Sequence, residues 1–275
     1  MLENLEPKPQ RELVIRREHV KILAVSDTHL GFDEANPRFL EFIKEITTSF
    51  DVDYFFILGD FLDLWRRDLA GVIVQFSDVV AELKKINEKI KVILIAGNHD
   101  WHLIPGKYTK GDVYSYPEPY QWYEVVKVIL PEREYKFLHG HQFDPKCSNE
   151  GVNESLCHSN DNAGKAMSEA WYKAHLTGAA MEEAKFHLLN NPNYPRIPPW
   201  ALSTIEYVAN PGAAGRRWQE IKDRVESTEN SYEYTVYGHT HHAYVSSKSA
   251  NTGCWCKDKS DYILIDNYEV TLHEW

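Results

Sequence analysis

The sequence has few cysteines, no long hydrophobic run and fewer basic than acidic residues. Four cysteines in a chain of 275 residues are too few for a scaffold that depends on disulfides. The longest apolar runs, at residues 54–58 and 92–96, are far too short to span a bilayer, and no signal-peptide pattern opens the sequence. We therefore expect a soluble, cytoplasmic protein without a transmembrane segment.

The charge balance limits the partners. Lysine and arginine together number 30 and aspartate and glutamate 41, which gives a formal net charge of −11. Binding to duplex nucleic acid takes most of its affinity from a basic face, so a duplex is not an expected partner, although a local basic pocket is compatible with this balance. The hydrophobic fraction of 43% is sufficient for the core of an ordinary globular domain.

The cysteines do not follow a standard zinc-binding pattern. They are Cys147, Cys157, Cys254 and Cys256. Free thiols are the simplest interpretation of this spacing, and a disulfide or a structural metal site are the two alternatives that the sequence leaves open.

The apolar pattern predicts an α/β fold with a helical insertion. In the first part, strands are expected over residues 20–26, 53–58 and 91–96, and helices over residues 37–50 and 70–90. Further strands are expected over residues 124–130, 135–138, 234–237, 243–246, 262–265 and 270–273. Between them, residues 163–175, 179–189 and 214–225 have helical spacing and are separated by prolines. We predict one domain over residues 1–275 that carries a helical cap, residues 146–231.

Five of the expected strands end directly in residue types that bind metals. The strand ends read Asp27-Thr28-His29, Gly59-Asp60-Phe61-Leu62-Asp63, Gly97-Asn98-His99-Asp100, His139-Gly140-His141 and Gly238-His239-Thr240-His241. Ligands of open α/β sheets bind outside the carboxyl ends of the strands, so these side chains are expected to converge. Imidazole and carboxylate ligands suit manganese, iron, zinc or cobalt, and the lack of thiolates at these five ends argues against a structural zinc site.

The number of candidate ligands exceeds the need of one ion. Two ions bridged by a carboxylate form the arrangement that holds both oxygens of a phosphoryl displacement. Each motif alone is weak evidence, because Asp and Asn also favour turns. The five motifs together, each at a strand end, predict a dinuclear metal centre.

The ordered set D-x-H, GDxxD, GNHD, HGH and GHxH resembles the calcineurin-like metallophosphoesterase superfamily. The resemblance implies a four-layer αββα β-sandwich with a dinuclear centre at one edge. It also implies that one ion is held by Asp27, His29, Asp60 and His241, and the other by Asp60, Asn98, His139 and His239, with Asp60 as the bridge. Manganese is the expected metal, and iron, zinc, cobalt or nickel would also suit.

The same resemblance assigns His99 and Asp63 to catalysis. The GNHD histidine, His99, would face the scissile phosphate, and Asp63 would orient it. A hydroxide that bridges the two metals would attack phosphorus, while His99 neutralises charge or protonates the leaving oxygen.

A narrower resemblance, to the UDP-2,3-diacylglucosamine hydrolase (pyrophosphatase) branch, rests on GDFLDLW, HGHQFD, the insertion and NTGCW. It implies a nucleotide-linked pyrophosphate as substrate. The sequence departs from that branch at His99, His141 and Cys254, where related enzymes often carry Arg, Asp and Asp. We therefore expect a metal-dependent hydrolase of phosphoester or pyrophosphate bonds. The alternatives are a phosphodiesterase or nuclease acting on nucleotides, and a non-enzymatic scaffold with the same fold.

Four further residues are candidates for substrate contact. They are His141, His242, Arg216 and Arg217. His141 could instead support a ligand, and the two arginines could form an ordinary solvated helix face. The expected substrate is a phosphorylated small molecule or a nucleotide-linked compound, and no oligomeric state is predicted.

Overall fold

A computed structural model describes residues 12–32, 35, 37–64, 69–104, 121–144, 211–227 and 232–275. The helices expected over residues 163–175 and 179–189, and most of the expected cap, lie outside these ranges. So do Cys147, Cys157 and the side chain of Arg216.

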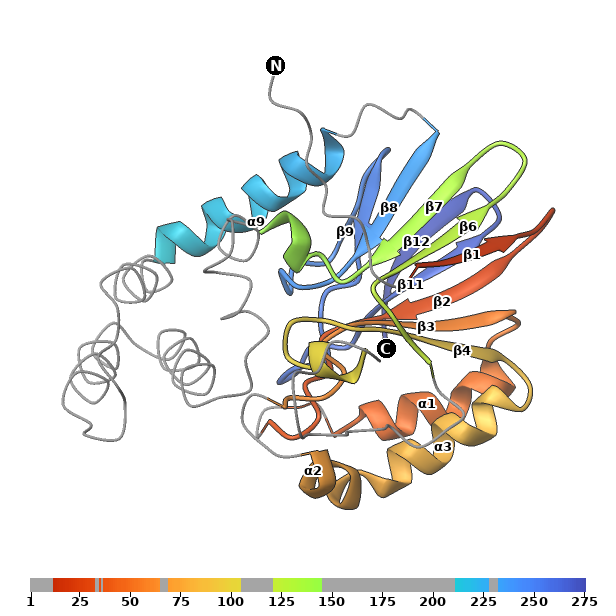
Figure 1. The fold of residues 1–275 in the computed structure, drawn as a ribbon, viewed down its shortest axis with the longest axis vertical. Coiled ribbons are helices and arrows are strands. Elements are labelled where there is room, and N and C mark those ends of the chain that lie inside the picture. The colour runs from red at the N-terminus through yellow and green to blue at the C-terminus, as the bar shows by residue number, and fades with distance from the viewer. Residues whose placement is uncertain are drawn as a thin grey trace.

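Two six-stranded sheets form the centre of the molecule (Figure 1). The first sheet has the order β1 (Glu12–Arg16), β6 (Val125–Ile129), β7 (Glu134–Leu138), β8 (Glu233–Tyr237), β10 (Ser249–Asn251) and β9 (Tyr244–Val245). The second has the order β12 (Glu269–Glu274), β11 (Asp261–Asp266), β2 (Lys21–Val25), β3 (Tyr54–Leu58), β4 (Lys91–Ile95) and β5 (Trp122–Tyr123). Strands β2, β3 and β4 are mutually parallel, as are β7, β8 and β10.

The central strands of the second sheet, β2, β3 and β4, are covered on both faces, which explains why they are almost wholly hydrophobic. In β2, Ile22 and Ala24 pack into the core between the two sheets, whereas Leu23 and Val25 pack into the core beneath the helices. Alternate side chains point to opposite faces of a strand, so a strand that is covered on both sides must be apolar at every position.

Three helices cover the outer face of the second sheet: α1 (Phe39–Ser49), α2 (Leu69–Gln75) and α3 (Ser77–Asn87) (Figure 1). The prediction of a single helix over residues 70–90 is wrong. The chain leaves helical geometry at Phe76, which has φ −110° and ψ 31°. Within this predicted helix, Val74 is 77% exposed. At about 100° per residue, Val74 lies on the side of the helix opposite Val72, which is buried.

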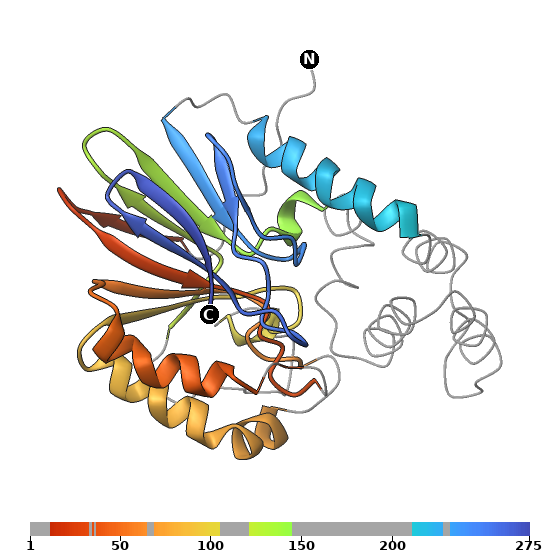
Figure 2. The same cartoon turned by 180° about the vertical axis from the view of Figure 1, so that it is seen from behind.

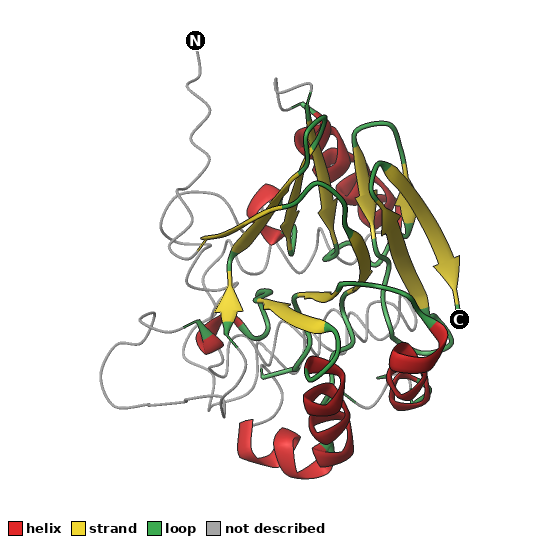
Figure 3. Ribbon diagram, turned by 90° about the vertical axis from the view of Figure 1, so that its right-hand side faces the viewer, coloured by secondary structure: helices red, strands yellow, loops and turns green. Residues whose placement is uncertain are grey.

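A fourth layer is formed by α9 (Pro211–Glu226), which extends the helix expected over residues 214–225. Its residues Ile221 and Val225 are buried against Tyr237 of β8. Figure 2 shows α9 on the opposite side of the strands from α1 and α3, and Figure 3 shows the strands between helices on two sides. The expected αββα order of layers is therefore confirmed. No helix within the described ranges is both long and apolar enough to cross a bilayer.

Candidate metal centre

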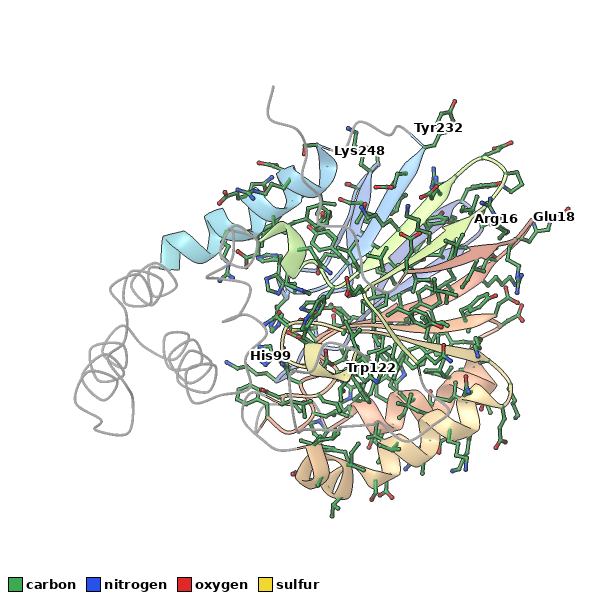
Figure 4. All side chains as sticks on the ribbon, viewed as in Figure 1. Arg16, Glu18, His99, Trp122, Tyr232 and Lys248 are labelled. Atoms are coloured by element: carbon green, nitrogen blue, oxygen red, sulfur yellow. The ribbon has the colours of Figure 1, made fainter. Side chains whose placement is uncertain are left out.

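The candidate residues meet at one edge of both sheets, because the strands that precede them are parallel. Within the second sheet, Asp27 N donates to Gly59 O (3.0 Å) and His29 N donates to Asp60 O (2.9 Å). The two sheets are joined at this edge by His239 N, which donates to Asp27 Oδ2 (2.9 Å). Figure 4 shows His99 at this edge, away from Arg16 and Glu18 at the opposite end of the strands.

The backbone at this edge has a conformation that non-glycine residues rarely adopt. Five of the expected ligands have φ between 46° and 66°: Asp27, His29, Asp60, His239 and His241. This backbone conformation costs a non-glycine residue on the order of 1–3 kcal/mol of conformational free energy, and such residues cluster at functional sites. Gly59 has φ +85°, and a Cβ there would meet the His139 ring. The sharp turns direct the side chains inward, so local strain is concentrated where the ligands lie.

The first group of expected ligands is closely packed. His29 Nε2 lies 3.2 Å from His241 Nε2, which lies 3.2 Å from Asp27 Oδ1. His29 Nε2 is 3.8 Å from Asp27 Oδ1 and 3.8 Å from Asp60 Oδ2. Asp27 and Asp60 are buried. The four side chains expected to hold one ion therefore surround a common point.

The second group lies on the other side of Asp60. His139 Nε2 is 3.3 Å from Asp60 Oδ2 and 3.2 Å from Asn98 Oδ1. His139 Nδ1 donates to Leu58 O (2.8 Å), which fixes the tautomer so that Nε2 has its lone pair toward the site. His239 completes the group, since one of its ring nitrogens lies within 4.8 Å of the ligand atoms of Asp60 and His139.

Asp60 connects the two groups. Its Oδ2 is the atom close to both His29 and His139, whereas its Oδ1 accepts a hydrogen bond from His99 N (2.9 Å). A Cβ at Gly97 would collide with Asp60 Oδ1 and with the Asp60 amide, so glycine is required for this approach. One carboxylate between two imidazole clusters is the arrangement that a bridging ligand needs.

The donor set fits two divalent cations. Among the residues that the structure describes, none gives Asp27 Oδ1 a hydrogen bond of acceptable geometry, although this oxygen is buried. Buried carboxylate oxygens are normally paired or bound to a metal. The facing nitrogen and oxygen donors are of the types that bind manganese, iron, zinc or cobalt.

The charges of the site compensate one another. Burial by itself would raise the pKa of Asp60, yet the neighbouring His139 and His99 hold it well below its usual range. Burial would lower the pKa of His139, but the charges of Asp60 and Asp27 raise it to about 9. Burial and the charge of His99 lower the pKa of His29 to about 3. Cations that bind here would replace protons shared between these groups.

His99 and Asp63 form a pair beside the two groups. His99 Nδ1 lies 3.0 Å from Asp63 Oδ1, and Asp63 is buried. His99 Nε2 is 3.8 Å from Asp60 Oδ2. The His99 ring meets the His29 ring edge-on, with centroids 4.7 Å apart. This contact and the Asp63 hydrogen bond fix the orientation of His99, with Nε2 directed toward the expected metal positions.

The candidate substrate residues are placed differently from one another. His141 is buried, and its ring lies 5.4 Å from that of His139 and 5.2 Å from that of Trp101. His242 is exposed and stacks on Trp218 of α9, with ring centroids 4.7 Å apart. Arg217 Nε donates a hydrogen bond to the carboxylate of Asp144. His141 is thus adjacent to the candidate ligand His139, whereas His242 and Arg217 contact Trp218 and Asp144.

Asp144 was not predicted as a site residue. Its Oδ2 accepts hydrogen bonds from His239 Nε2 (2.8 Å) and from Arg217 Nε (2.9 Å) and Nη2. Burial would raise the pKa of Asp144, but Arg217 and His239 keep it far below its usual range. Because Nε2 of His239 is bound to Asp144, Nδ1 is the nitrogen left for a metal. The sequence signal for Asp144 was the HGHQFD motif, which begins at the candidate ligand His139 directly after β7 and ends at Asp144.

Cys254 and Cys256 were also missed. Both are free and buried, and Cys256 lies in one group with His29 and His241, all ligand atoms within 4.8 Å of one another. No thiol was expected at the site, because the short strand β10 was not predicted from the sequence. That strand is parallel to β8 and therefore places the two cysteines at the same edge as His241.

Comparison with known proteins adds a family. The profile of the calcineurin-like phosphoesterase family matches residues 20–243. A UDP-2,3-diacylglucosamine hydrolase of Azotobacter vinelandii is 38% identical over 84 residues, 29% of this chain and 33% of that protein. A protein of the same name from Shewanella pealeana is 35% identical over 85 residues, 30% of this chain and 34% of that protein. The matches thus span about a third of the length of these relatives.

Two solved structures are similar along most of the chain at low scores. A dimetal phosphatase from Danio rerio has a TM-score of 0.42 and 10% identity, covering 93% of this chain and 99% of its own. A metallophosphoesterase from Sphaerobacter thermophilus has a TM-score of 0.34 and 12% identity. The match covers 94% of this chain and 88% of the Sphaerobacter chain. These scores are too low to support an argument. The family match, which includes all the strand ends that carry expected ligands, is decisive: the chain belongs to the calcineurin-like phosphoesterase family.

Proposed function

We propose that this protein is a dinuclear metal-dependent hydrolase of phosphoester or pyrophosphate bonds. The observation that carries the proposal is the position of Asp60 Oδ2, between His29 Nε2 (3.8 Å) and His139 Nε2 (3.3 Å). One buried carboxylate oxygen that faces two separate groups of ligands suits two cations that share it.

The proposed ligands follow from the two groups. One ion is held by Asp27, His29, Asp60 and His241, and the other by Asp60, Asn98, His139 and His239. When bound, the two cations would supply Lewis acidity toward the phosphoryl oxygens and lower the pKa of an attacking water. Asp144 then orients His239 through Nε2, and Leu58 O orients His139 through Nδ1.

His99 is the proposed general acid. The Nδ1 proton is committed to the buried carboxylate of Asp63, so the proton available for transfer is the one on Nε2. His99 keeps an exposed side-chain fraction of 12%, whereas Asp63 is inaccessible, so a substrate can reach the ring but not its partner. A protonated His99 can neutralise charge on a phosphoryl oxygen or protonate the leaving oxygen.

The proposed substrate class is a nucleotide-linked pyrophosphate. Its support is the printed name of the curated relatives, UDP-2,3-diacylglucosamine hydrolase, whose matches cover about 30% of this chain. A phosphodiesterase acting on nucleotides would use the same centre. A non-enzymatic scaffold is disfavoured, because a chain without chemistry would not need every ligand position and the His99–Asp63 pair to be filled.

Two expectations complete the proposal. We propose manganese as the metal, with iron, zinc, cobalt or nickel as alternatives, and the cytoplasm as the location. The cap over residues 146–231 stays a prediction. It is supported by α9, which holds Asp144 beside a ligand through Arg217.

An activity panel tests the proposal. The metal-free chain is loaded with Mn²⁺ and assayed against a phosphomonoester, bis-p-nitrophenyl phosphate and a nucleotide-linked pyrophosphate, with the His99→Ala variant as the matched control. We expect hydrolysis that a chelator abolishes and that Mn²⁺ restores, with preference for the pyrophosphate. A chain that binds two ions and hydrolyses none of the three classes would contradict the proposed function.

A further inference from the structure

Two buried thiols lie against the first group of ligands. Cys254 and Cys256 follow β10, and the backbone there is tied to the ligand loop, since Trp255 N donates to Asp27 O (3.1 Å). Cys256 Sγ lies 3.5 Å from the same carbonyl oxygen. Interactions with Cys256 and with the His241 ring hold the pKa of the Cys254 thiol well below its usual range. Neither thiol has a role in the proposed chemistry.

The donor atoms around Asp27 are close enough together to bind a single ion. Cys256 Sγ and one imidazole nitrogen each of His29 and His241 lie within 4.8 Å of one another. Ligand atoms at metal distances of 2.0–2.3 Å that lie about 90–110° apart are separated by about 2.8–3.8 Å. His241 Nε2 lies 3.2 Å from His29 Nε2 and 3.2 Å from Asp27 Oδ1, and His29 Nε2 lies 3.8 Å from Asp27 Oδ1.

The buried oxygen is the second observation that points to a ligand here. Asp27 is fully buried, and within the described part of the chain its Oδ1 receives no hydrogen bond of acceptable geometry. A cation at the centre of the group would satisfy that oxygen and would accept electron pairs from both imidazoles.

We propose that Cys256 supplies a thiolate, in addition to the four ligands already named, to the ion held by Asp27, His29, Asp60 and His241. When the sulfur–metal bond forms, the thiol gives its proton to the solvent, and the weak contact with Asp27 O is lost. This inference rests on the proposed function and deepens it, because it makes the two metal positions unequal. A sulfur donor favours zinc, cobalt or ferrous iron, whereas the oxygen and nitrogen donors around Asn98 and His139 suit manganese.

Cobalt absorption tests the proposal directly. The metal-free full chain, kept reduced with a phosphine, is titrated with Co²⁺, and absorption is recorded in the near ultraviolet, where thiolate-to-cobalt charge transfer absorbs, and in the visible. We expect the charge-transfer band in the wild type and in Cys254→Ser, and its loss in Cys256→Ser with the visible cobalt bands kept. Bound cobalt without the band in the wild type, or a band that survives in Cys256→Ser, would overturn the proposal.

Metal competition provides a second readout. With Zn²⁺ and Mn²⁺ supplied together, the wild type should take up zinc at one position, and Cys256→Ser should lose roughly tenfold or more of this preference. Equal preference in the two proteins would overturn the proposal. A chain that shows the charge-transfer band but hydrolyses no phosphoester supports the thiolate ligand and contradicts the proposed function, so the two failures can be told apart.

Discussion

At the scale of single residues, chemistry and metal binding are assigned to different side chains. His99 Nδ1 is held by Asp63 at 3.0 Å, and His99 itself belongs to neither of the two proposed ligand sets. The prediction of this pair from sequence rested on motif resemblance, and the structure brings the two side chains together. Cys256 belongs to none of the five ligand motifs, and Asp144 lies in HGHQFD without a role assigned to it, so the contacts of both residues emerged only from the placed loops.

A substitution of His99 separates these roles. His99→Ala should keep both ions and lose about 10²–10⁴ in kcat, which is the usual contribution of an acid–base group. Asp63→Asn should cost less in the same direction, because it disturbs the orientation of the ring and leaves the imidazole in place. Elemental analysis and kinetics of the purified variants check this. A His99→Ala protein with an empty metal position would show that His99 is a ligand.

At the scale of elements, the strands that bear the site were predicted from the sequence, whereas β1, β5 and β10 were not. Strands β2, β3 and β4 are almost wholly apolar, β7 and β8 alternate apolar with polar residues, and all five end in candidate ligands. The short strands β5 and β10 have two and three residues, too few for any periodicity. The break at Phe76 was missed because apolar residues continue through it.

One tertiary contact links α9 to a ligand. Arg217 binds Asp144, which is buried and in turn binds His239, so Arg217→Met leaves a buried carboxylate with less compensation. We expect a loss on the order of 3 kcal/mol in unfolding free energy. We also expect roughly tenfold weaker metal binding, because support of a metal-bound histidine is lost.

The matched control is Arg224→Met on the same helix. Arg224 pairs with Glu220, and both side chains are close to half exposed, so its loss should change stability by less than about 0.5 kcal/mol. Chemical denaturation and metal titration of the two variants decide the point. Equal behaviour of the two variants would show that the contact of Arg217 with Asp144 carries no support to the site.

At the scale of the whole molecule, the chain leaves the described fold after Asp144 and returns at Pro211, the first residue of α9. Asp144 binds the ligand His239, and α9 is tied to Asp144 through Arg217. We therefore expect the segment between them to contribute substrate contacts and to exclude water. The composition alone predicted the absence of a spanning segment, but it could not specify the substrate.

Replacing residues 146–210 with a short Gly/Ser linker tests the cap while keeping α9. We expect both ions to remain, hydrolysis of bis-p-nitrophenyl phosphate to persist, and KM for the nucleotide-linked pyrophosphate to rise by about tenfold or more. Elemental analysis and steady-state kinetics give the three values. Unchanged kcat/KM for the pyrophosphate in a folded, metal-loaded protein would show that the segment has another role.

The central claim is that two ions share Asp60, and metal counting tests it most directly. Inductively coupled plasma analysis of the wild type should find two ions per chain, and Asp60→Asn should lower the occupancy of both positions and abolish hydrolysis. Asp51→Asn is the matched control, because its carboxylate is 94% exposed and remote from the ligands. Two ions and normal activity in Asp60→Asn would contradict the account.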